Sequence, residues 1–244
     1  MMTIMSGLLS AFSFNLFPGT CILCNALTQR PIDLCEPCQR DLPHARSACD
    51  ICALPLPYVG TCGRCLARPP YFQRAFAAFI YESPVDRLVN EFKSGRRLVG
   101  KVLSDILGAE FATTSKREDF PDLLIPVPLT RSRIHQRGFN QALDIALHVS
   151  DRIKVPVAQD ICHRIKETPQ QKTLSAASRK RILRGAFEIQ GDIQGRSIGL
   201  VDDVVTTGAS ASEIARTLLM SGAETISVLA LARTPVHSGV SQHA

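Results

Sequence analysis

The sequence lacks the features that would direct a protein into or across a membrane. Residues 1–20 contain no lysine or arginine, so the basic segment that opens a secretory signal is missing. No apolar run reaches the roughly 18 to 20 residues that a membrane-spanning helix needs. We therefore expect a cytoplasmic protein without a transmembrane segment. The apolar residues 1–19 are expected to form a short arm that packs on the rest of the protein or on a partner, ended by Pro18 and Gly19.

The composition excludes disorder and fibrous repeats as the main state of the chain. Hydrophobic residues make up 45% and charged residues 20% of the 244 positions. These values are typical of soluble globular proteins, so most of the chain can bury a core. The length allows one domain of ordinary size and a smaller second domain.

The net charge of +6 is concentrated in one region. Residues 131–184 carry twelve lysines and arginines against four acidic residues, whereas residues 1–70 carry five against four. A local basic excess attracts phosphate groups, whether on a small anion or on a nucleic-acid backbone. The alternative is a solvated helix face without a ligand.

Nine cysteines are present, and eight of them form four CxxC pairs before residue 66. Each pair can present two thiolates to one tetrahedral ion, so four pairs supply two four-cysteine zinc sites. The alternative is a set of disulfides, which would need an oxidising compartment. The predicted zinc ligands are Cys21, Cys24, Cys35, Cys38, Cys49, Cys52, Cys62 and Cys65.

Residues 20–70 form the predicted double zinc ribbon. This region has little helical periodicity, many prolines and few large apolar side chains, so metal has to supply most of its stability. Sequential pairing, with residues 21–38 at one site and residues 49–65 at the other, fits the spacing of two small ribbons, and a crossed pairing stays open. Ribbons of this kind bind nucleic acid, bind protein or brace a neighbouring domain.

The predicted fold class of residues 71–236 is α/β. Short apolar runs alternate with helical stretches, which is typical of a mainly parallel sheet with helices on both faces. We predict strands at 76–81, 123–127, 186–189, 197–205 and 225–232, and helices within 84–111, 141–153 and 212–222. Ligands of such sheets bind beyond the carboxyl ends of the strands. Residues 237–244 are expected to be a flexible tail.

One loop between a strand and a helix carries the strongest functional signal, at residues 198–210, IGLVDDVVTTGAS. An apolar strand ends at Asp202 and Asp203, which can accept hydrogen bonds from sugar hydroxyls. The chain then turns through Thr-Thr-Gly into a helix whose free N–H groups and dipole favour a phosphate. Together these features describe a ribose 5-phosphate site, although a strand-end turn or a helix cap would explain either half alone.

The same thirteen positions resemble the phosphoribosyl pyrophosphate (PRPP) loop of type I phosphoribosyltransferases. The resemblance implies a type I phosphoribosyltransferase-like sheet, preceded here by the small zinc-ribbon domain. Magnesium would then bridge the pyrophosphate and the ribose hydroxyls of PRPP. The implied PRPP-binding residues are Asp202, Asp203, Val204, Val205, Thr206, Thr207, Gly208, Ala209 and Ser210.

From about Phe17 to Pro235 the chain resembles the ComF family, the competence-associated relatives of phosphoribosyltransferases. The resemblance is carried by the double zinc ribbon, the PRPP loop and the motifs CGRC at 62–65, YESPVDRL at 81–88, IPVP at 125–128, RGFNQ at 137–141 and RGAF at 184–187. It implies a cytoplasmic protein that handles incoming single-stranded DNA during natural transformation or uses DNA as a nutrient.

A second loop between a strand and a helix, at residues 131–141, is predicted to hold pyrophosphate, as its counterpart does in phosphoribosyltransferases. It follows the strand at 123–127, and the next helix is expected to begin at Asn140 or just before it. A solvated entry loop is the alternative. The predicted phosphate contacts in this loop are Arg131, Arg133 and Arg137.

Residues 167–184 form a polar, basic stretch before the strand predicted at 186–189. In type I phosphoribosyltransferases a mobile loop closes over the transition state and keeps water out. This stretch is our candidate for that lid, with Lys172 as a phosphate contact. In the other interpretation, the contacts to a DNA backbone come from Lys172, Arg179, Lys180 and Arg181.

Three functions stay open on the sequence alone. In the first, which we favour, the protein binds PRPP with Mg²⁺ and handles single-stranded DNA. In the second, it is an active phosphoribosyltransferase for an unidentified base or amine, although no catalytic base can be named and the acceptor segment at 232–235 identifies no substrate. In the third, it is a scaffold whose zinc ribbons dock a DNA-processing partner such as a helicase.

Overall fold

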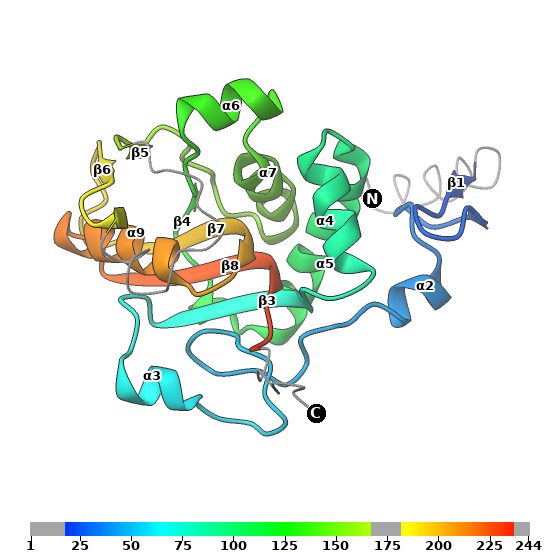
Figure 1. Ribbon diagram of the computed structural model, residues 1–244, viewed down its shortest axis with the longest axis horizontal. Helices are drawn as coiled ribbons and strands as arrows, with labels where there is room; N and C mark the ends of the chain where they lie inside the picture. Colours follow the sequence, from blue (N-terminus) through cyan, green and yellow to red (C-terminus); the bar gives the residue numbers. More distant parts are fainter. Residues whose placement is uncertain (1–17, 167–181, 237–244) are drawn as a thin grey trace, which may run out of the picture. The chain divides into compact units, whose positions relative to one another are not determined.

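The computed structural model describes residues 18–166 and 182–236 (Figure 1). The chain divides into two compact units, with the boundary between Leu42 and Pro43. Within the described residues, no helix combines the length and the apolar character needed to cross a membrane. Several predicted features lie outside the described ranges: most of the N-terminal arm, the tail, and the basic residues Lys172, Arg179, Lys180 and Arg181.

The smaller unit contains the first four predicted zinc ligands and little regular structure. Cys21 and Leu34 are fully buried in it. Its elements are a two-stranded antiparallel ribbon, β1 (Gly19–Thr20) with β2 (Leu27–Thr28), and one short helix, α2 (Glu36–Arg40).

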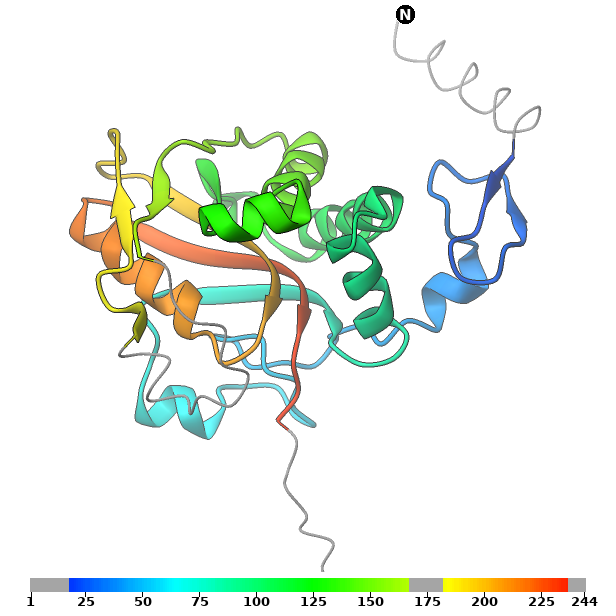
Figure 2. The ribbon, with the colours of Figure 1, turned by 45° about the horizontal axis from the view of Figure 1, so that its top comes forward.

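The larger unit is built on a parallel sheet with the strand order β3-β8-β7-β4, which confirms the predicted α/β class (Figure 2). The two inner strands are long apolar runs, as expected for strands that are buried on both faces. The strands are β3 (Arg74–Ile80), β4 (Leu123–Pro126), β7 (Ser197–Val205) and β8 (Thr225–Arg233). A separate antiparallel pair joins β5 (Cys162–Arg164), which was not predicted, to β6 (Phe187–Ile189).

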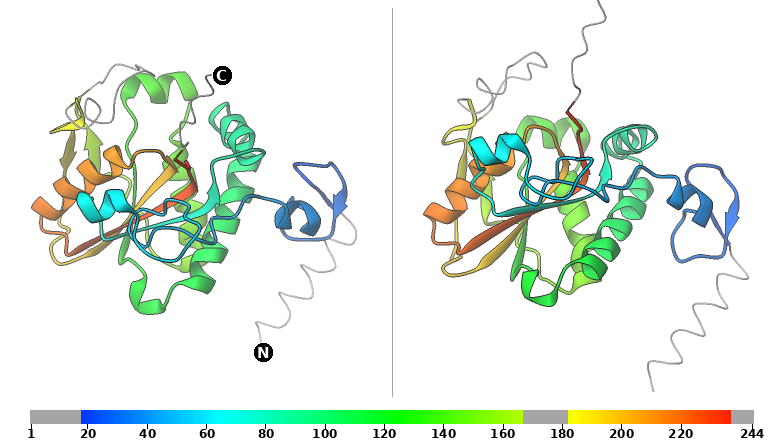
Figure 3. Two further views of the ribbon diagram at one scale, coloured as in Figure 1. Left: turned by 60° about the horizontal axis from the view of Figure 1, so that its bottom comes forward. Right: turned by 90° about the horizontal axis from the view of Figure 1, so that it is seen from below.

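Helices lie on both faces of this sheet, as Figure 3 shows. On one face, Phe76 of β3 packs its ring edge-on against Phe111, with the ring centroids 5.5 Å apart. The main helices are α4 (Val85–Lys93), α5 (Arg97–Thr114), α7 (Gln141–Ile153) and α9 (Ala209–Met220), and a short 3₁₀ turn, η1, spans Arg117–Asp119. The single helix expected within 84–111 is therefore two helices, because the chain turns at Gly95, whose φ is +106°.

The opposite face of the sheet is covered by α9 and by the second cysteine group. Ala75 and Ala77, which alternate with Phe76 along β3, belong to one buried cluster with Ile214 of α9 and the second set of cysteines. The helix α3 (Gly63–Ala67) begins within that set. The second cysteine group is thus part of the core of the α/β unit, whereas the first group lies in the smaller unit.

Candidate functional site

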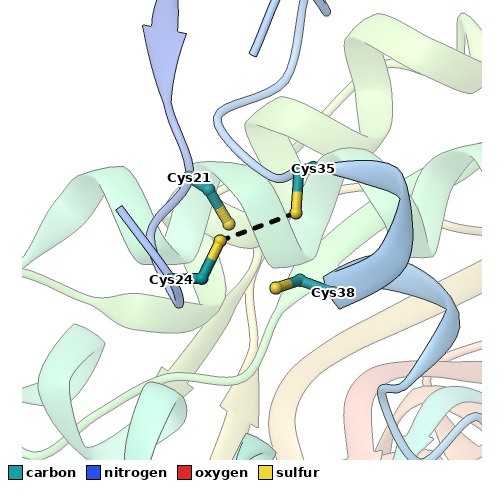
Figure 4. Close-up of side chains that lie close together, drawn as sticks. All are labelled: Cys21, Cys24, Cys35 and Cys38. Atoms are coloured by element: carbon teal, nitrogen blue, oxygen red, sulfur yellow. Dashed lines mark hydrogen bonds between the residues drawn. The ribbon is translucent and has the colours of Figure 1, made fainter. Parts of the chain in front are cut away.

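The first four cysteines bring their sulfur atoms together in the smaller unit (Figure 4). All four sulfur atoms lie within 4.8 Å of one another, and the Sγ atoms of Cys24 and Cys35 are 3.7 Å apart. A tetrahedral zinc ion with Zn–S bonds of about 2.3 Å holds its sulfur atoms roughly 3.8 Å apart. The group, which we call tetrad 1, therefore has the dimensions of a zinc site.

The second set of four cysteines, tetrad 2, has the same arrangement within the larger unit. Its members Cys52 and Cys62 have their Sγ atoms 3.7 Å apart, and all four residues of the set are buried. The structure thus groups the eight cysteines sequentially, 21–38 and 49–65, and none of the nine cysteines forms a disulfide. Both tetrads are consistent with zinc.

The first cysteine of each tetrad is held as a good metal ligand by backbone donors. Burial alone raises the pKa of Cys21, but N–H groups of Cys35, Cys24 and Leu23 outweigh it and bring the pKa down to about 6. Backbone N–H donors likewise outweigh burial at Cys49 and lower the pKa of its thiol to about 7. One of these donors is the N–H of Cys62, which lies 3.3 Å from Cys49 Sγ. N–H donors around a thiolate favour the charged form that binds metal.

The two predicted sugar-binding carboxylates lie at the carboxyl end of β7, the strand between β8 and β4. Asp202 Oδ1 accepts the N–H of Asp203 at 2.8 Å, and Asp203 Oδ1 accepts the N–H of Val204 at 2.6 Å. Burial and the neighbouring charge of Asp203 raise the pKa of Asp202 to about 7. The pair is therefore a compact cluster of oxygen acceptors that holds a proton more tightly than a free carboxylate does.

The turn after β7 leads directly into α9. Gly208 has φ of +75°, a conformation that favours glycine, and stands immediately before the helix. The N–H of Ala209 is partnered by Thr207 Oγ1 at 3.3 Å. The remaining residues of the predicted PRPP loop lie in this turn or beside it: Val204, Val205, Thr206 and Ser210.

A basic residue that the sequence did not single out contacts the carboxylate pair. Lys93, the last residue of α4, places its Nζ 3.1 Å from Asp203 Oδ2. Both side chains are mostly shielded from solvent, with exposed fractions of 23% and 17%. Helical periodicity predicted only the apolar side of α4, so nothing in the sequence pattern marked Lys93 as part of the site.

The segment predicted as a pyrophosphate loop contains a helix instead, α6 (Arg131–Arg137). Thr130 caps its first turn by accepting the N–H of Arg133, and Gly138, with φ of +78°, ends it. The expected helix start near Asn140 is correct for α7, since the Asn140 side chain accepts the N–H of Ala142. A polar helix without an apolar stripe gives no periodic signal, so α6 was missed.

The three arginines predicted as phosphate contacts all lie in α6, but they have different neighbours. The positive charge of Arg133 contributes to lowering the pKa of Asp202. Arg137, one turn later on the same face, donates to the buried Gln141 at 3.0 Å. Arg131 lines a cleft on another side of the helix.

The connection from α6 to α7 is fixed against neighbouring elements. The ring of Phe139 lies 5.5 Å from that of Phe92 in α4, and the Arg97 guanidinium lies over it at 5.3 Å. The Asn140 side chain donates to the carbonyl of Val127 at 3.2 Å. These contacts hold α6 beside the end of β4 and hence near the carboxylate pair.

The cleft beside α6 has a volume of about 690 Å³. The loop after β4 contributes Thr130 and Arg131, and the start of β5 contributes Cys162 and His163. Burial raises the pKa of Cys162 to about 12, so its thiol is unsuited to act as a nucleophile near neutral pH. The cleft opens next to the proposed phosphate-binding elements and is large enough for a small ligand.

Comparisons with known proteins assign the chain to a family. Residues 14–66 match the double zinc ribbon domain model. "DNA utilization protein YhgH" of Shigella flexneri is 36% identical over 222 residues, covering 89% of this chain and 98% of that protein. "Competence protein F" of Haemophilus influenzae is 32% identical over 227 residues, covering 90% and 99%. This chain belongs to the ComF family.

The sequence comparisons confirm the predicted resemblance to the ComF family, and the similarity extends over nearly the whole length of both relatives. A solved structure, the purine phosphoribosyltransferase from Pyrococcus horikoshii Ot3, covers 61% of this chain and 72% of its own, with 17% identity and a TM-score of 0.33. Because this identity and this TM-score are low, the family assignment rests on the sequence relatives. The fold itself is described by the parallel order β3-β8-β7-β4.

Proposed function

We propose that this ComF-family protein binds PRPP with Mg²⁺ at the end of β7. The observation that carries the proposal is the convergence of three features: the Asp202–Asp203 pair, the Thr-Thr-Gly turn into α9, and the Lys93 ammonium that contacts the pair. The charge of Arg133 also lowers the pKa of Asp202. The carboxylates would accept hydrogen bonds from the ribose hydroxyls, and the turn with the helix N-terminus would bind the 5-phosphate.

The two kinds of metal would have different tasks. Zinc would stabilise the folded chain around each tetrad. Mg²⁺, which prefers oxygen ligands and substrate phosphates, would neutralise the pyrophosphate of PRPP. The helix α6 follows the neighbouring strand β4 and carries Arg131 and Arg133, and in this proposal these arginines bind the pyrophosphate next to the ribose. Transfer to an acceptor is a separate question, and pyrophosphate release from PRPP in the presence of candidate bases would detect it.

The proposal is tested by calorimetric titration of the zinc-loaded protein with PRPP and Mg²⁺. An Asp202→Asn/Asp203→Asn variant should bind PRPP at least about tenfold more weakly, because two charge-assisted hydrogen bonds of roughly 1.5 to 3 kcal/mol each are lost. The matched control is Asp151→Asn, an exposed carboxylate on α7 whose partner is Lys154. Absence of binding by the wild-type protein, or equal affinity in the double variant, would contradict the proposal.

We further propose that the protein binds single-stranded DNA in the service of DNA use or natural transformation. Support comes from the relatives named as DNA utilization and competence proteins and from the basic excess of residues 131–184. Phosphate contacts make binding weaken with salt, with a slope of about −0.7 in log–log form for each phosphate contacted on a single strand.

Anisotropy of a labelled oligothymidylate provides the measurement for DNA binding. We expect saturable binding at low salt that weakens steadily as sodium chloride is raised. A variant in which Arg131 and Arg133 are replaced by glutamine should have a shallower salt slope. If the oligonucleotide does not bind, or binds with no salt dependence, the basic region does not serve DNA, and the scaffold function with a docked helicase becomes the better account.

A further inference from the structure

A buried arginine joins tetrad 2 to the loop that leaves β7. Arg233, the last residue of β8, has an exposed fraction of only 1%. Its Nε donates to the carbonyl of Cys52 at 3.0 Å, and its Nη1 donates to the carbonyls of Val205, at 3.0 Å, and Thr206. A buried guanidinium is costly unless its donors are satisfied. The guanidinium carries several N–H donors in a fixed planar geometry, so this one side chain can bond to Cys52 and to the loop after β7 at the same time.

Two further contacts link the same parts of the molecule. The N–H of Tyr71, which follows the second ribbon, donates to Ser212 Oγ in the first turn of α9 at 3.2 Å. The ring of Phe72 lies beside Gly208, with its Cζ 3.8 Å from the position that a Cβ there would occupy. Phe72, Val205 and tetrad 2 belong to one buried cluster. The ribbon therefore packs under the turn as well as being bonded to it.

The direction of the bonded carbonyl groups determines which way the loop presents its donors. In a trans peptide, the C=O of one residue and the N–H of the next point in opposite directions. Since the carbonyls of Val205 and Thr206 turn toward Arg233, the N–H groups of Thr206 and Thr207 turn away from it. Backbone N–H groups at this turn are the donors on which the proposed phosphate site depends.

We infer that Arg233 is a positioning residue through which metal binding at tetrad 2 holds the loop after β7 in its ligand-binding conformation. The identity of the ligand, a 5-phosphoribosyl group, rests on the proposed function. Cys52 is at once a member of tetrad 2 and the carbonyl partner of Arg233, so the metal fixes the turn that presents this carbonyl. Coupling between two sites is reciprocal, so a ligand on the loop also retains the metal at tetrad 2.

The first test replaces Arg233 with methionine, which keeps the length but loses the donors, and with lysine, which keeps a charge and a donor. Arg233→Met should keep zinc at both tetrads while amide hydrogen exchange at residues 205–210 accelerates and PRPP affinity falls, each by about fivefold or more. Arg233→Lys should restore part of both. The matched control is Arg216→Met on α9, whose guanidinium pairs with Glu213 and does not reach the loop.

The second test uses the wild-type protein and does not depend on the variant folding. Zinc release to a chromogenic chelator is followed with and without saturating PRPP and Mg²⁺, and a Cys35→Ser variant identifies the phase that belongs to tetrad 1. PRPP should slow release from tetrad 2 by about fivefold or more. Release from tetrad 1, which lies in the separate smaller unit, should be unchanged and serves as the internal control.

The outcomes separate this inference from the proposed function. Loop exchange at the wild-type rate in folded, zinc-loaded Arg233→Met would overturn the inference, and so would a release rate from tetrad 2 that bound PRPP leaves unchanged. If PRPP does not bind to the wild-type protein at all, the proposed function fails. Hydrogen exchange at 205–210, compared with exchange in α7 of the same unit before and after zinc removal, then still decides whether tetrad 2 orders the loop. A larger acceleration in the loop than in α7 supports the coupling, and an equal acceleration or none excludes it.

Discussion

A Cys62→Ser variant should lose most of the stability of the larger unit. Cys62 is 3% exposed, and its whole tetrad belongs to the buried cluster that covers one face of the sheet. Structural zinc contributes about 10 to 16 kcal/mol in small modules, whereas an entire domain is stable by only about 5 to 15 kcal/mol. Removing one ligand of tetrad 2 therefore weakens the metal site and leaves an unpaired polar group in the core.

The corresponding substitution in tetrad 1 should destabilise only the smaller unit. Cys35 belongs to the smaller unit, where Cys24 is exposed and few apolar side chains are buried. A Cys35→Ser variant should lose one zinc ion, and residues 18–42 should become sensitive to protease. The melting temperature of the larger unit should stay at the wild-type value.

Zinc content, thermal unfolding and limited proteolysis of the two variants check this contrast. Each variant should hold less zinc than the wild-type protein, but only Cys62→Ser should lose the cooperative melting of the α/β unit. Equal zinc content in Cys35→Ser and the wild-type protein would rule out tetrad 1 as a metal site. An unchanged melting curve for Cys62→Ser would show that the sheet is stable without tetrad 2.

The positions of the sheet strands could be predicted from the sequence because the signal is local. The runs at 197–205 and 225–232 are rich in apolar residues, and they are the two central strands of the sheet. The CxxC spacing likewise predicts the tetrads, because ligands of one knuckle are close in sequence. The spacing does not predict how differently the two tetrads are packed. Their internal patterns differ by only one residue, yet only tetrad 2 packs into the α/β core.

Other parts of the site depend on the fold and could not be predicted from the sequence. Lys93 and Asp203 are far apart in the chain and meet only because α4 ends beside the end of β7. Arg233 is the charged last residue of an otherwise apolar strand, which suggests an exposed ligand contact, yet the side chain is buried and bonded to backbone carbonyls. For α6, which has no apolar stripe, the cap residues Thr130 and Gly138 were the only available signal in the sequence.

Replacing Asp202 with asparagine should make the free protein more stable at pH 8. Burial and the charge of Asp203 raise the pKa of Asp202 to about 7 in the folded protein, from an ordinary value of 3.8. Between these two values the folded state binds more protons than the unfolded state, so unfolding becomes easier as the pH rises through this window. Asparagine removes this poorly solvated charge, so the gain should reach about 2 to 4 kcal/mol at pH 8 and vanish near pH 4.

Thermal or urea unfolding of the wild-type protein and Asp202→Asn at pH 5 and pH 8 checks this expectation. The control is Asp105→Asn, because Asp105 is buried and lies 3.1 Å from Lys101 and 3.4 Å from Arg152. Loss of that paired carboxylate should lower stability at both pH values. A constant difference between Asp202→Asn and the wild-type protein across the pH range would refute the raised pKa.

The sign of this effect distinguishes a binding group from a structural one. A carboxylate kept for stability should be paired so that its charge favours folding, as Asp105 is. Asp202 is instead held next to a second carboxylate, and only part of that repulsion is offset by Lys93 and Arg133. A variant that is more stable at pH 8 but binds PRPP more weakly would show that the pair is held in a costly ionised state for its ligand.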